Sequence, residues 1–446
     1  MKPVLKPLDQ QVIVITGATS GIGLATARMA ARRGAKLVLA ARSEGALGQL
    51  VAEIKAAGGS AVAVTADVAE EASSAAIATK AKEAFGRFDS WINNAGTGVY
   101  GRVEEVSIAD MRQAFEVNYW GLVYGSREAA KQLKQSGGGA IINLGSEVSE
   151  RSVPLQGAYS ATKFAIKGFT EALRMELEDE GAPISVTLIK PAQINTPFTI
   201  NAKNYLSSEP QHVPAVYAPE VVASTILRSA TKPVRSVFVG GGGALVATLG
   251  RFFPGLTDRL MEKTVIPGTP SGRPPRRAKD NSGLDGPTEA LTTTGNYPGH
   301  VARSSLYTQA ALNPMLTGAV ALGIGLLLRS SLSRRSHRPA RMLGGQGGRT
   351  EKALHIRLEA RPGRERDVEK LVADILQDVR GEPATGPWFG TRLSKRVFEI
   401  FERFPNEAGR RSHLSGRGAA RLMARSNAIL AKPAEISKLD VIGMKI

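Results

Sequence analysis

The feature that most constrains the fold is a strand, a glycine-rich turn and a helix in direct succession near the start of the chain. A β-branched run at 12–15 leads into the turn at 16–23, and an alanine-rich helix follows over 24–33. Glycines let such a turn approach a pyrophosphate, whose charge meets the free N–H groups at the helix start. A plain glycine turn is the alternative interpretation. The glycines of the turn are Gly17, Gly21 and Gly23.

The same alternation of strand and helix continues along the chain. Further apolar runs of strand length end at small or polar residues, and stretches of helix length separate them. Strands joined by helices pair in parallel through right-handed crossovers. The sequence therefore predicts an α/β fold with a Rossmann-type doubly wound parallel sheet. Strands are expected at 12–15, 36–40, 61–66, 90–92, 140–144, 184–189 and 236–239.

The residues after the second strand indicate which dinucleotide would bind. In folds of this kind an acid at this position bonds the ribose 2′-hydroxyl, whereas an arginine accommodates a 2′-phosphate. The chain has Ala41 and Arg42 here. We therefore predict NADP(H), and the alternative is that Arg42 only begins a solvated helix.

A serine, a tyrosine and a lysine between 146 and 163 indicate proton chemistry. Tyr159 and Lys163 are four residues apart, so one helix places them on the same face, where the ammonium favours an ionised phenol. Ser146 follows the strand at 140–144 and so lies at a carboxyl end, where open sheets bind ligands. The alternative for the tyrosine and lysine is a solvated helix face.

Polar and small residues follow two other strands. Asp67, followed by Val68, ends the third strand and could accept a hydrogen bond from an adenine amino group. The Asn-Asn-Ala-Gly sequence at 93–96 lets the chain pass close to a cofactor. A long helix is expected at 110–124, and Asn118 inside it indicates a local distortion, because asparagine side chains compete for backbone hydrogen bonds.

These motifs together resemble the short-chain dehydrogenase/reductase family over about residues 9–240. The resemblance implies that Tyr159 is the general acid in reduction and the general base in oxidation, while Ser146 holds the substrate oxygen. Lys163 would bind the nicotinamide ribose and lower the pKa of Tyr159, and Asn118 would position a water in a proton relay. The cofactor supplies the hydride. The cofactor-binding residues implied are Gly17, Thr19, Ser20, Gly21, Ile22, Gly23, Arg42, Asp67, Val68, Asn94, Ala95, Gly96, Tyr159, Lys163, Pro191 and Thr196.

The resemblance has one departure and leaves the substrate open. Pro191 and Thr196 match the family's loop, but Ala192 stands where the family usually has glycine, which restricts the turn. The segment 198–219 would be the lid over a small-molecule carbonyl or alcohol substrate, and it carries no clear periodicity. A homo-oligomer, either a dimer or a tetramer, is also expected.

Length, cysteine content and charge bound the remaining choices. A chain of 446 residues suffices for two or three domains. It contains no cysteine, which excludes disulfides and thiolate metal sites and fits the cytoplasm; we expect no metal site.

The net charge of +18 comes mainly from residues beyond 265. No zinc-finger or aromatic RNA-binding motif accompanies it, so a membrane surface is favoured over nucleic acid. Residues 1–10 lack the apolar segment of a secretory signal.

Two segments follow a first domain at 1–265. Residues 266–304 are rich in Pro, Gly, Thr and Arg and are predicted to be a flexible linker. Residues 305–350 hold an apolar run followed by arginines, a membrane-associating candidate. A helix at 314–328 would be about 22 Å long, short of the roughly 30 Å hydrocarbon core. A helix that starts at Ser305 could span it. The arginines and the NADP(H) domain both favour the cytoplasmic side, however, so we expect a re-entrant, monotopic or interfacial anchor. A helix buried against protein is the alternative.

The last segment, 351–446, has the order strand, helix, strand, strand, helix, strand, which predicts a ferredoxin-like α+β domain. Its sequence around Trp388 and His413 resembles the antibiotic-biosynthesis-monooxygenase-like domain. That family forms dimers and includes cofactor-free oxygenases. An aromatic residue and a lone histidine that serve only as core residues are the alternative.

Three functions are compatible with this organisation. The first is an NADP(H)-dependent oxidoreductase that interconverts a carbonyl and an alcohol, in the cytoplasm and associated with a membrane. The second is a scaffold that binds NADP(H) without turnover, and the catalytic residues argue against it. The third is a two-step quinone or polyketide enzyme that joins the reductase to a monooxygenase.

Overall fold

The computed structural model describes residues 3–275, 281–288, 291–313, 352–380, 382 and 385–441. The chain divides into two compact units, Met1–Arg329 and Ser330–Ile446.

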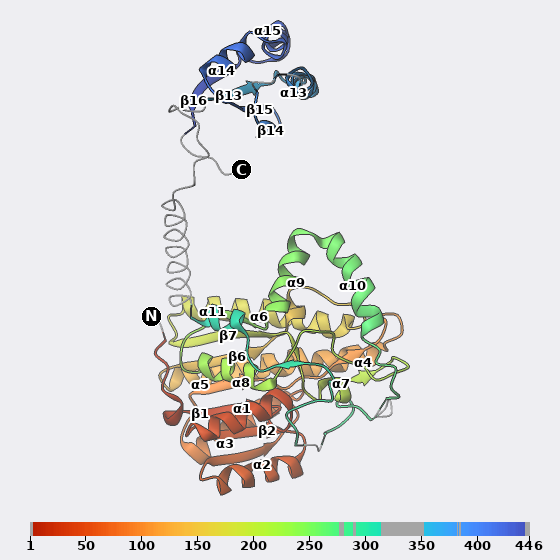
Figure 1. Ribbon diagram of the computed structural model, residues 1–446. Helices are drawn as coiled ribbons and strands as arrows, with labels where there is room; N and C mark the ends of the chain where they lie inside the picture. Colours follow the sequence, from red (N-terminus) through yellow and green to blue (C-terminus); the bar gives the residue numbers. More distant parts are fainter. Residues whose placement is uncertain are drawn as a thin grey trace, which may run out of the picture. The chain divides into compact units, whose positions relative to one another are not determined.

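A seven-stranded sheet forms the centre of the first unit, and all its neighbouring strands are parallel (Figure 1). The strands are β1 (Val12–Thr16), β2 (Lys36–Ala41), β3 (Ser60–Thr65), β4 (Ser90–Asn93), β6 (Gly139–Leu144), β7 (Ile184–Pro191) and β11 (Ser236–Val239). Their order is β11-β7-β6-β4-β1-β2-β3, so the winding reverses between β1 and β4. The predicted Rossmann-type doubly wound sheet is confirmed.

Helices cover both faces of this sheet. They are α1 (Gly21–Arg32), α2 (Glu44–Ala56), α3 (Glu71–Phe85), α5 (Gly121–Gln135), α6 (Gly157–Asp179) and α8 (Pro219–Ser229). Ile13 and Ile15 of β1 belong to a core cluster with residues of α1, α2 and α8. Val12 and Val14 belong to a second cluster with residues of α3, α5 and α6. Burial on both faces explains why the strands are continuous apolar runs in the sequence.

The helix expected at 110–124 is divided by a π-helical turn. The helix α4 (Ile108–Phe115) leads into η2 (Glu116–Trp120), and α5 continues from it. Asn118 lies in η2 and is buried. The local distortion predicted from Asn118 is therefore confirmed, and such π-turns are frequent at functional sites.

Shorter elements complete the first unit. The strands β8 (Gln193–Ile194), β10 (Val216–Tyr217) and β12 (Val301–Ala302) form a small parallel sheet, and β5 (Val99–Tyr100) pairs with β9 (Lys203–Asn204). The helices α9 and α10 form a hairpin that projects from the sheet (Figure 1). The other short elements are η1 (Leu8–Gln10), η3 (Glu147–Ser149), α7 (Phe198–Asn201), α9 (Gly241–Phe252), α10 (Pro254–Gly268) and α11 (Leu306–Leu312).

Residues 281–288 and 291–297, which we call the strap, pack on the first unit. Leu284 is only 3% exposed and joins the cluster that contains Val99 and Val106. The Asp285 carboxylate lies 2.8 Å from the Lys203 ammonium. The structure thus differs from the flexible linker expected at 266–304. Backbone hydrogen bonds, an ion pair and two leucines, Leu284 and Leu291, hold the strap, so it needs few other apolar residues.

The second unit is a four-stranded antiparallel sheet with helices. The order β14-β15-β13-β16 is that of a ferredoxin-like fold, as the sequence predicts. Val368, Leu371 and Ile375 of α13 and Leu422 of α15 are buried in its core. The elements are β13 (Lys352–Glu359), α13 (Glu365–Val379), β14 (Trp388–Arg392), β15 (Val397–Phe404), α14 (Glu407–Leu414), α15 (Arg417–Ile429) and β16 (Glu435–Asp440).

The predicted membrane-associating segment at 305–350 lies outside the described residues from 314 onward. Its first part forms α11, which packs on the first unit: Thr308 Oγ1 donates to the Phe238 carbonyl, and Arg228 donates to the Leu312 carbonyl. Among the described residues, no helix has both the length and the apolarity to cross a membrane.

Candidate active site

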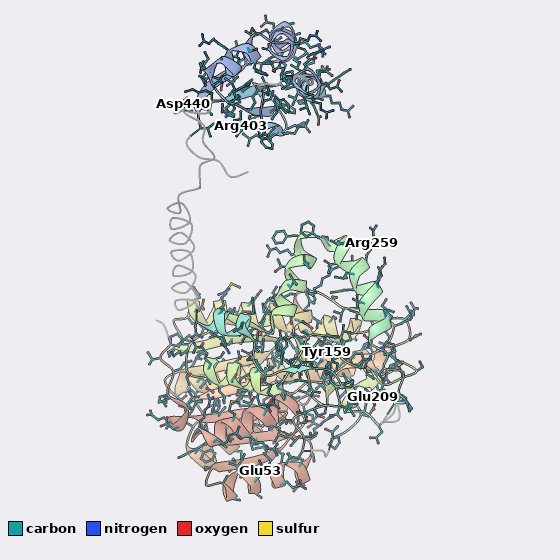
Figure 2. The ribbon with its side chains drawn as sticks, in the orientation of Figure 1. Glu53, Tyr159, Glu209, Arg259, Arg403 and Asp440 are labelled. Carbon is teal, nitrogen blue, oxygen red and sulfur yellow. The ribbon has the colours of Figure 1, made fainter. Side chains whose placement is uncertain are left out.

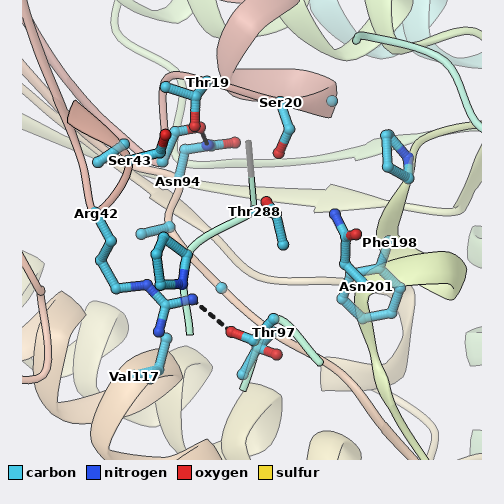
Figure 3. A pocket seen from close by; sticks show the side chains of 18 of the residues that line it. Thr19, Ser20, Arg42, Ser43, Asn94, Thr97, Val117, Phe198, Asn201 and Thr288 are labelled. Atoms are coloured by element: carbon cyan, nitrogen blue, oxygen red, sulfur yellow. Dashed lines mark hydrogen bonds between the residues drawn. The ribbon is translucent and has the colours of Figure 1, made fainter. Parts of the chain in front are cut away.

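A cleft lies at the carboxyl ends of β1, β2 and β4, where the winding of the sheet reverses. Arg42, Thr288 and Ser20 lie around it in Figure 3. Such switch points are where open α/β sheets bind ligands. Of the predicted cofactor-binding residues, the cleft is lined by Gly17, Thr19, Ser20, Gly21, Ile22, Arg42, Asp67, Val68, Asn94, Ala95, Gly96 and Thr196.

The glycine turn is packed so closely that side chains do not fit. Gly17 has a φ of 64°, and a Cβ there would lie 2.8 Å from the Ala95 Cα. A Cβ on Gly23 would lie 2.1 Å from the Gly17 carbonyl oxygen. Ser20 caps α1 by position, but its hydroxyl makes no capping hydrogen bond. The turn therefore presents a helix start whose N-cap hydroxyl does not cap the helix, which fits a phosphate group.

The strap reaches two of the predicted cofactor contacts. The Arg42 guanidinium donates to the Gly283 carbonyl and, at 2.8 Å, to the Gly286 carbonyl. The Gly21 amide donates to the Thr292 carbonyl at 3.0 Å. Gly283 and Thr288 also line the cleft. The strap is thus one wall of the cleft, at the end where Arg42 lies.

A second cavity adjoins the cleft and shares five lining residues with it: Ile22, Asn94, Gly96, Thr196 and Phe198. Ser146, Tyr159 and Lys163 all line this cavity, and Tyr159 lies inside the first unit in Figure 2. Ser146 precedes η3 just beyond β6, and α6 carries Tyr159 and Lys163 one turn apart. The Lys163 Nζ lies 5.5 Å from the centroid of the Tyr159 ring.

Burial sets the pKa of both groups on α6. It raises the pKa of Tyr159; a hydrogen bond with Ser146 lowers it, and the nearby Glu147 carboxyl raises it further. Burial lowers the pKa of Lys163 to about 8. Lys163 is 5% exposed, and its hydrogen-bond acceptor within the described chain is the Leu144 carbonyl, at 2.8 Å. No carboxylate of the described residues forms an ion pair with this ammonium.

Asn118 connects the neighbouring loop to α6 without lining either cavity. Its Oδ1 accepts from the Thr97 amide at 2.8 Å, and its Nδ2 donates to the Thr97 carbonyl at 2.9 Å and to the Thr162 hydroxyl at 3.1 Å. Thr97 lines the first cleft, and Thr162 adjoins Lys163 in the chain. The asparagine thus fixes both groups relative to each other.

Comparison with known proteins agrees with this geometry. The model of the short chain dehydrogenase family matches residues 11–206. The uncharacterized oxidoreductase YxnA of Bacillus subtilis is 45% identical over 322 residues, which cover 72% of this chain and 90% of YxnA. The chain belongs to the short-chain dehydrogenase family.

A further relative and one solved structure are also similar to this chain. A 3beta-hydroxysteroid dehydrogenase of Mediterraneibacter gnavus is 36% identical over 192 residues, 43% of this chain and 68% of that protein. The solved structure of a short chain dehydrogenase/reductase from Burkholderia phymatum in complex with NAD is 28% identical. It covers 61% of this chain and 99% of its own, with a TM-score of 0.51. The first unit is accordingly a short-chain dehydrogenase unit, and the Burkholderia phymatum structure shares its fold.

The structure brings most of the residues predicted for this dehydrogenase together. Pro191, Tyr159 and Lys163 line the second cavity with Ser146, and twelve others line the first cleft. Gly23 and Asn118 line neither; the glycine allows α1 to approach the turn, and the asparagine acts through Thr97 and Thr162. Ala192 is accommodated at the end of β7, where its amide donates to the Val239 carbonyl.

Several residues that line the second cavity, among them Tyr100 and Gln156, were not predicted from the sequence, and three more form a hydrogen-bonded row. Glu147, Gln193 and His212 line it beside Ser146 and Tyr159. Glu147 directly follows Ser146, Gln193 lies in the loop that departs from the family, and His212 lies in the predicted lid. The position of each residue beside a predicted site element was visible in the sequence. Their contacts were not, because Gln193 lies 19 positions from His212 and 46 positions from Glu147.

The second unit has a smaller, mainly apolar pocket with two titratable residues, Glu402 and His413. The His413 Nδ1 lies 2.7 Å from Glu382 Oε2, and its Nε2 lies 3.1 Å from Glu402 Oε2. Burial alone would lower the pKa of His413, but the two carboxylates raise it above its ordinary value. Trp388 instead packs against the hydrophobic core.

Proposed function

We propose that the first unit is an NADP(H)-dependent oxidoreductase that interconverts a carbonyl and an alcohol. The observation that carries the proposal is the position of Ser146, Tyr159 and Lys163 in one cavity that adjoins the glycine-turn cleft. The residues proposed to transfer the proton then lie next to the cleft proposed to hold the cofactor. Hydride transfer to a carbonyl requires this proximity.

In this proposal the glycine turn holds the pyrophosphate of the dinucleotide, and the bound cofactor supplies or accepts the hydride. The Ser146 hydroxyl orients the substrate oxygen, and the Tyr159 hydroxyl gives that oxygen a proton in reduction. In oxidation the tyrosine oxygen takes the proton back. Phenols ionise near pH 10, so a base at neutral pH needs help from a cation, which the Lys163 ammonium supplies.

The preference for NADP(H) over NAD(H) rests on Arg42. No acid follows β2, and the guanidinium lies on the wall of the cleft. Its partners there are the carbonyls of Gly283 and Gly286, with the Asp67 carboxylate 3.9 Å away. A 2′-phosphate would exchange these neutral partners for a charged one, and charge-assisted hydrogen bonds are stronger.

A screen of purified enzyme tests the function. NADPH oxidation is followed over ketones, quinones and fatty acyl carbonyls, with Tyr159→Phe beside the wild type. We expect turnover of at least one carbonyl, and a loss of about 100-fold or more in Tyr159→Phe. Tight NADPH binding without turnover over the whole panel would favour the scaffold instead.

The similarity of the second unit to a monooxygenase-like domain stays a proposal, supported by the ferredoxin-like strand order and the apolar pocket. A homo-oligomer and an association of residues 305–350 with a membrane surface on the cytoplasmic side are proposals of the same kind. Sedimentation of the purified chain and fractionation of membranes test the last two.

A further inference from the structure

The cavity that contains Tyr159 holds a row of polar side chains with no part in the proton transfer proposed above. Gln193 Nε2 donates to Glu147 Oε1 at 3.1 Å, and the Gln193 Oε1 lies 2.8 Å from the His212 Nδ1. All three residues line the cavity. They come from η3, from β8 and from the lid, so the row exists only in the folded chain.

The direction of these hydrogen bonds determines what His212 presents. The Gln193 side chain donates a hydrogen bond from its nitrogen to the carboxyl group of Glu147. Its oxygen therefore faces the imidazole and accepts a hydrogen bond from His212 Nδ1. The proton of the ring then lies on Nδ1, and Nε2 carries a lone pair. The second nitrogen of His212 is therefore a hydrogen-bond acceptor.

This acceptor has no partner within the described part of the chain. His212 is 8% exposed, and its Nε2 is a buried polar atom without a hydrogen bond. Burial lowers the pKa of His212 to about 4, which keeps the ring neutral at physiological pH. A buried acceptor without a partner costs free energy, so its presence on a cavity wall indicates a ligand that donates to it.

The ring is held in place by the strap. Tyr297 packs edge-on against His212, with 6.3 Å between the ring centroids, and the Tyr297 amide lies 3.4 Å from Asn195 Oδ1. The imidazole thus has an aromatic neighbour on one side and Gln193 on the other. A ring that is fixed in this way is preorganised for a ligand.

The charges around the cavity narrow the class of ligand. The lone pair of His212 and the carboxyl group of Glu147 disfavour a substrate carboxylate or phosphate. The Lys163 ammonium lines the same cavity and disfavours a second cation. A neutral hydroxyl satisfies the acceptor without either repulsion.

We propose that His212, held by Gln193 and Glu147, accepts a hydrogen bond from a second hydroxyl of the substrate. The substrate class is therefore a neutral hydroxylated carbonyl in reduction and a diol in oxidation. This rests on the proposed carbonyl–alcohol function and specifies its substrate class. Carbonyls without the second hydroxyl leave the His212 acceptor unpaired and react less well.

The test compares cyclohexanone with 2-, 3- and 4-hydroxycyclohexanone as substrates of the full-length enzyme with NADPH. At one hydroxyl position we expect kcat/KM to exceed that of cyclohexanone by about 10-fold or more. In His212→Phe this ratio falls to within about twofold of one, mainly through KM. His212→Gln, whose amide oxygen is also an acceptor, restores part of the ratio. His300→Phe, at an exposed histidine of the same unit, keeps the wild-type ratio.

Two outcomes would overturn the proposal: a wild-type ratio near one at every hydroxyl position, or a full ratio in His212→Phe. The wild-type comparison is decisive even if the variant does not fold.

A failure of the proposed function is distinguishable, because then neither cyclohexanone nor its derivatives are reduced with NADPH or NADH. Calorimetry with cyclohexanol and the three cyclohexanediols then measures the site without turnover. We expect one diol to bind about 10-fold more tightly than cyclohexanol, and the gain to disappear in His212→Phe. Equal affinities in the wild type would contradict the proposal.

Discussion

Lys163 in the first unit and His413 in the second are both buried basic groups on a cavity wall, with 5% and 4% of their surface exposed. Their partners differ. Lys163 has a backbone carbonyl, and burial lowers its pKa to about 8, whereas His413 lies between two carboxylates that raise its pKa.

We interpret this difference as one between a site suited to the proposed reaction and a site whose charges stabilise the fold. An uncompensated buried ammonium costs free energy in the folded protein, but it can act on a neighbouring phenol or an anionic ligand. Both ring nitrogens of His413 face carboxylates of the protein, so they are less available to a ligand. We therefore place the proposed reaction at Lys163 and interpret the His413 group as structural.

The largest expected effect is at Lys163. Lys163→Met retains the length and apolar bulk of the side chain but removes the charge that we propose to favour the Tyr159 phenolate. We expect kcat/KM for carbonyl reduction to fall by about 100-fold or more. Lys167→Met is a matched control on the same helix, because Lys167 pairs with Glu150 instead. Equal losses in the two variants would contradict the role of Lys163.

Arg42 resembles Lys163 in that its hydrogen bonds go to backbone carbonyls. In Arg42→Ala we expect KM for NADPH to rise about 10-fold and KM for NADH to change less than about twofold, because only NADPH has the 2′-phosphate. Steady-state kinetics with both cofactors measures the two constants. A similar change for both would assign Arg42 to holding the strap.

The two carboxylates beside His413 are expected to stabilise the folded second unit. Glu402→Gln removes one of the two carboxylates and should lower the melting temperature of the second unit by about 4–8 °C at pH 6. A raised pKa of His413 in the folded state gives stability that is fully present below its unfolded pKa of about 6.5. That stability is lost as the pH rises through the folded pKa, so the difference should shrink at pH 9. The kcat/KM of Glu402→Gln for carbonyl reduction should equal that of the wild type at both pH 6 and pH 9.

The smallest effect is expected at Glu147, whose pKa burial raises to about 7, with an opposing hydrogen bond from Gln193. Above pH 7 its carboxylate disfavours the Tyr159 phenolate. In Glu147→Gln the rise of alcohol oxidation with pH should shift toward lower pH by about half a unit. An unchanged profile of kcat/KM against pH would show that the two groups do not interact.

The sequence was sufficient for the parts of the site that local patterns encode. The spacing of Tyr159 and Lys163 is a helical repeat, Ser146 lies just beyond the end of a strand, and Asn118 predicted a local distortion, which the structure shows to be a π-turn. The strap could not be predicted, because Arg42 and Gly283 are 241 residues apart and the strap has few apolar positions. The row of Glu147, Gln193 and His212 could not be predicted either, because its hydrogen bonds join residues that are far apart in the sequence.

The central claim is that the uncompensated site of the first unit carries the reaction and the satisfied site of the second unit does not. It is tested most directly by carbonyl-dependent NADPH oxidation in Tyr159→Phe and His413→Gln, prepared and assayed side by side. We predict that Tyr159→Phe loses about 100-fold or more of the wild-type kcat/KM, whereas His413→Gln retains it within about twofold. Full activity in Tyr159→Phe, or an equal loss in His413→Gln with its first unit still folded, would contradict the account.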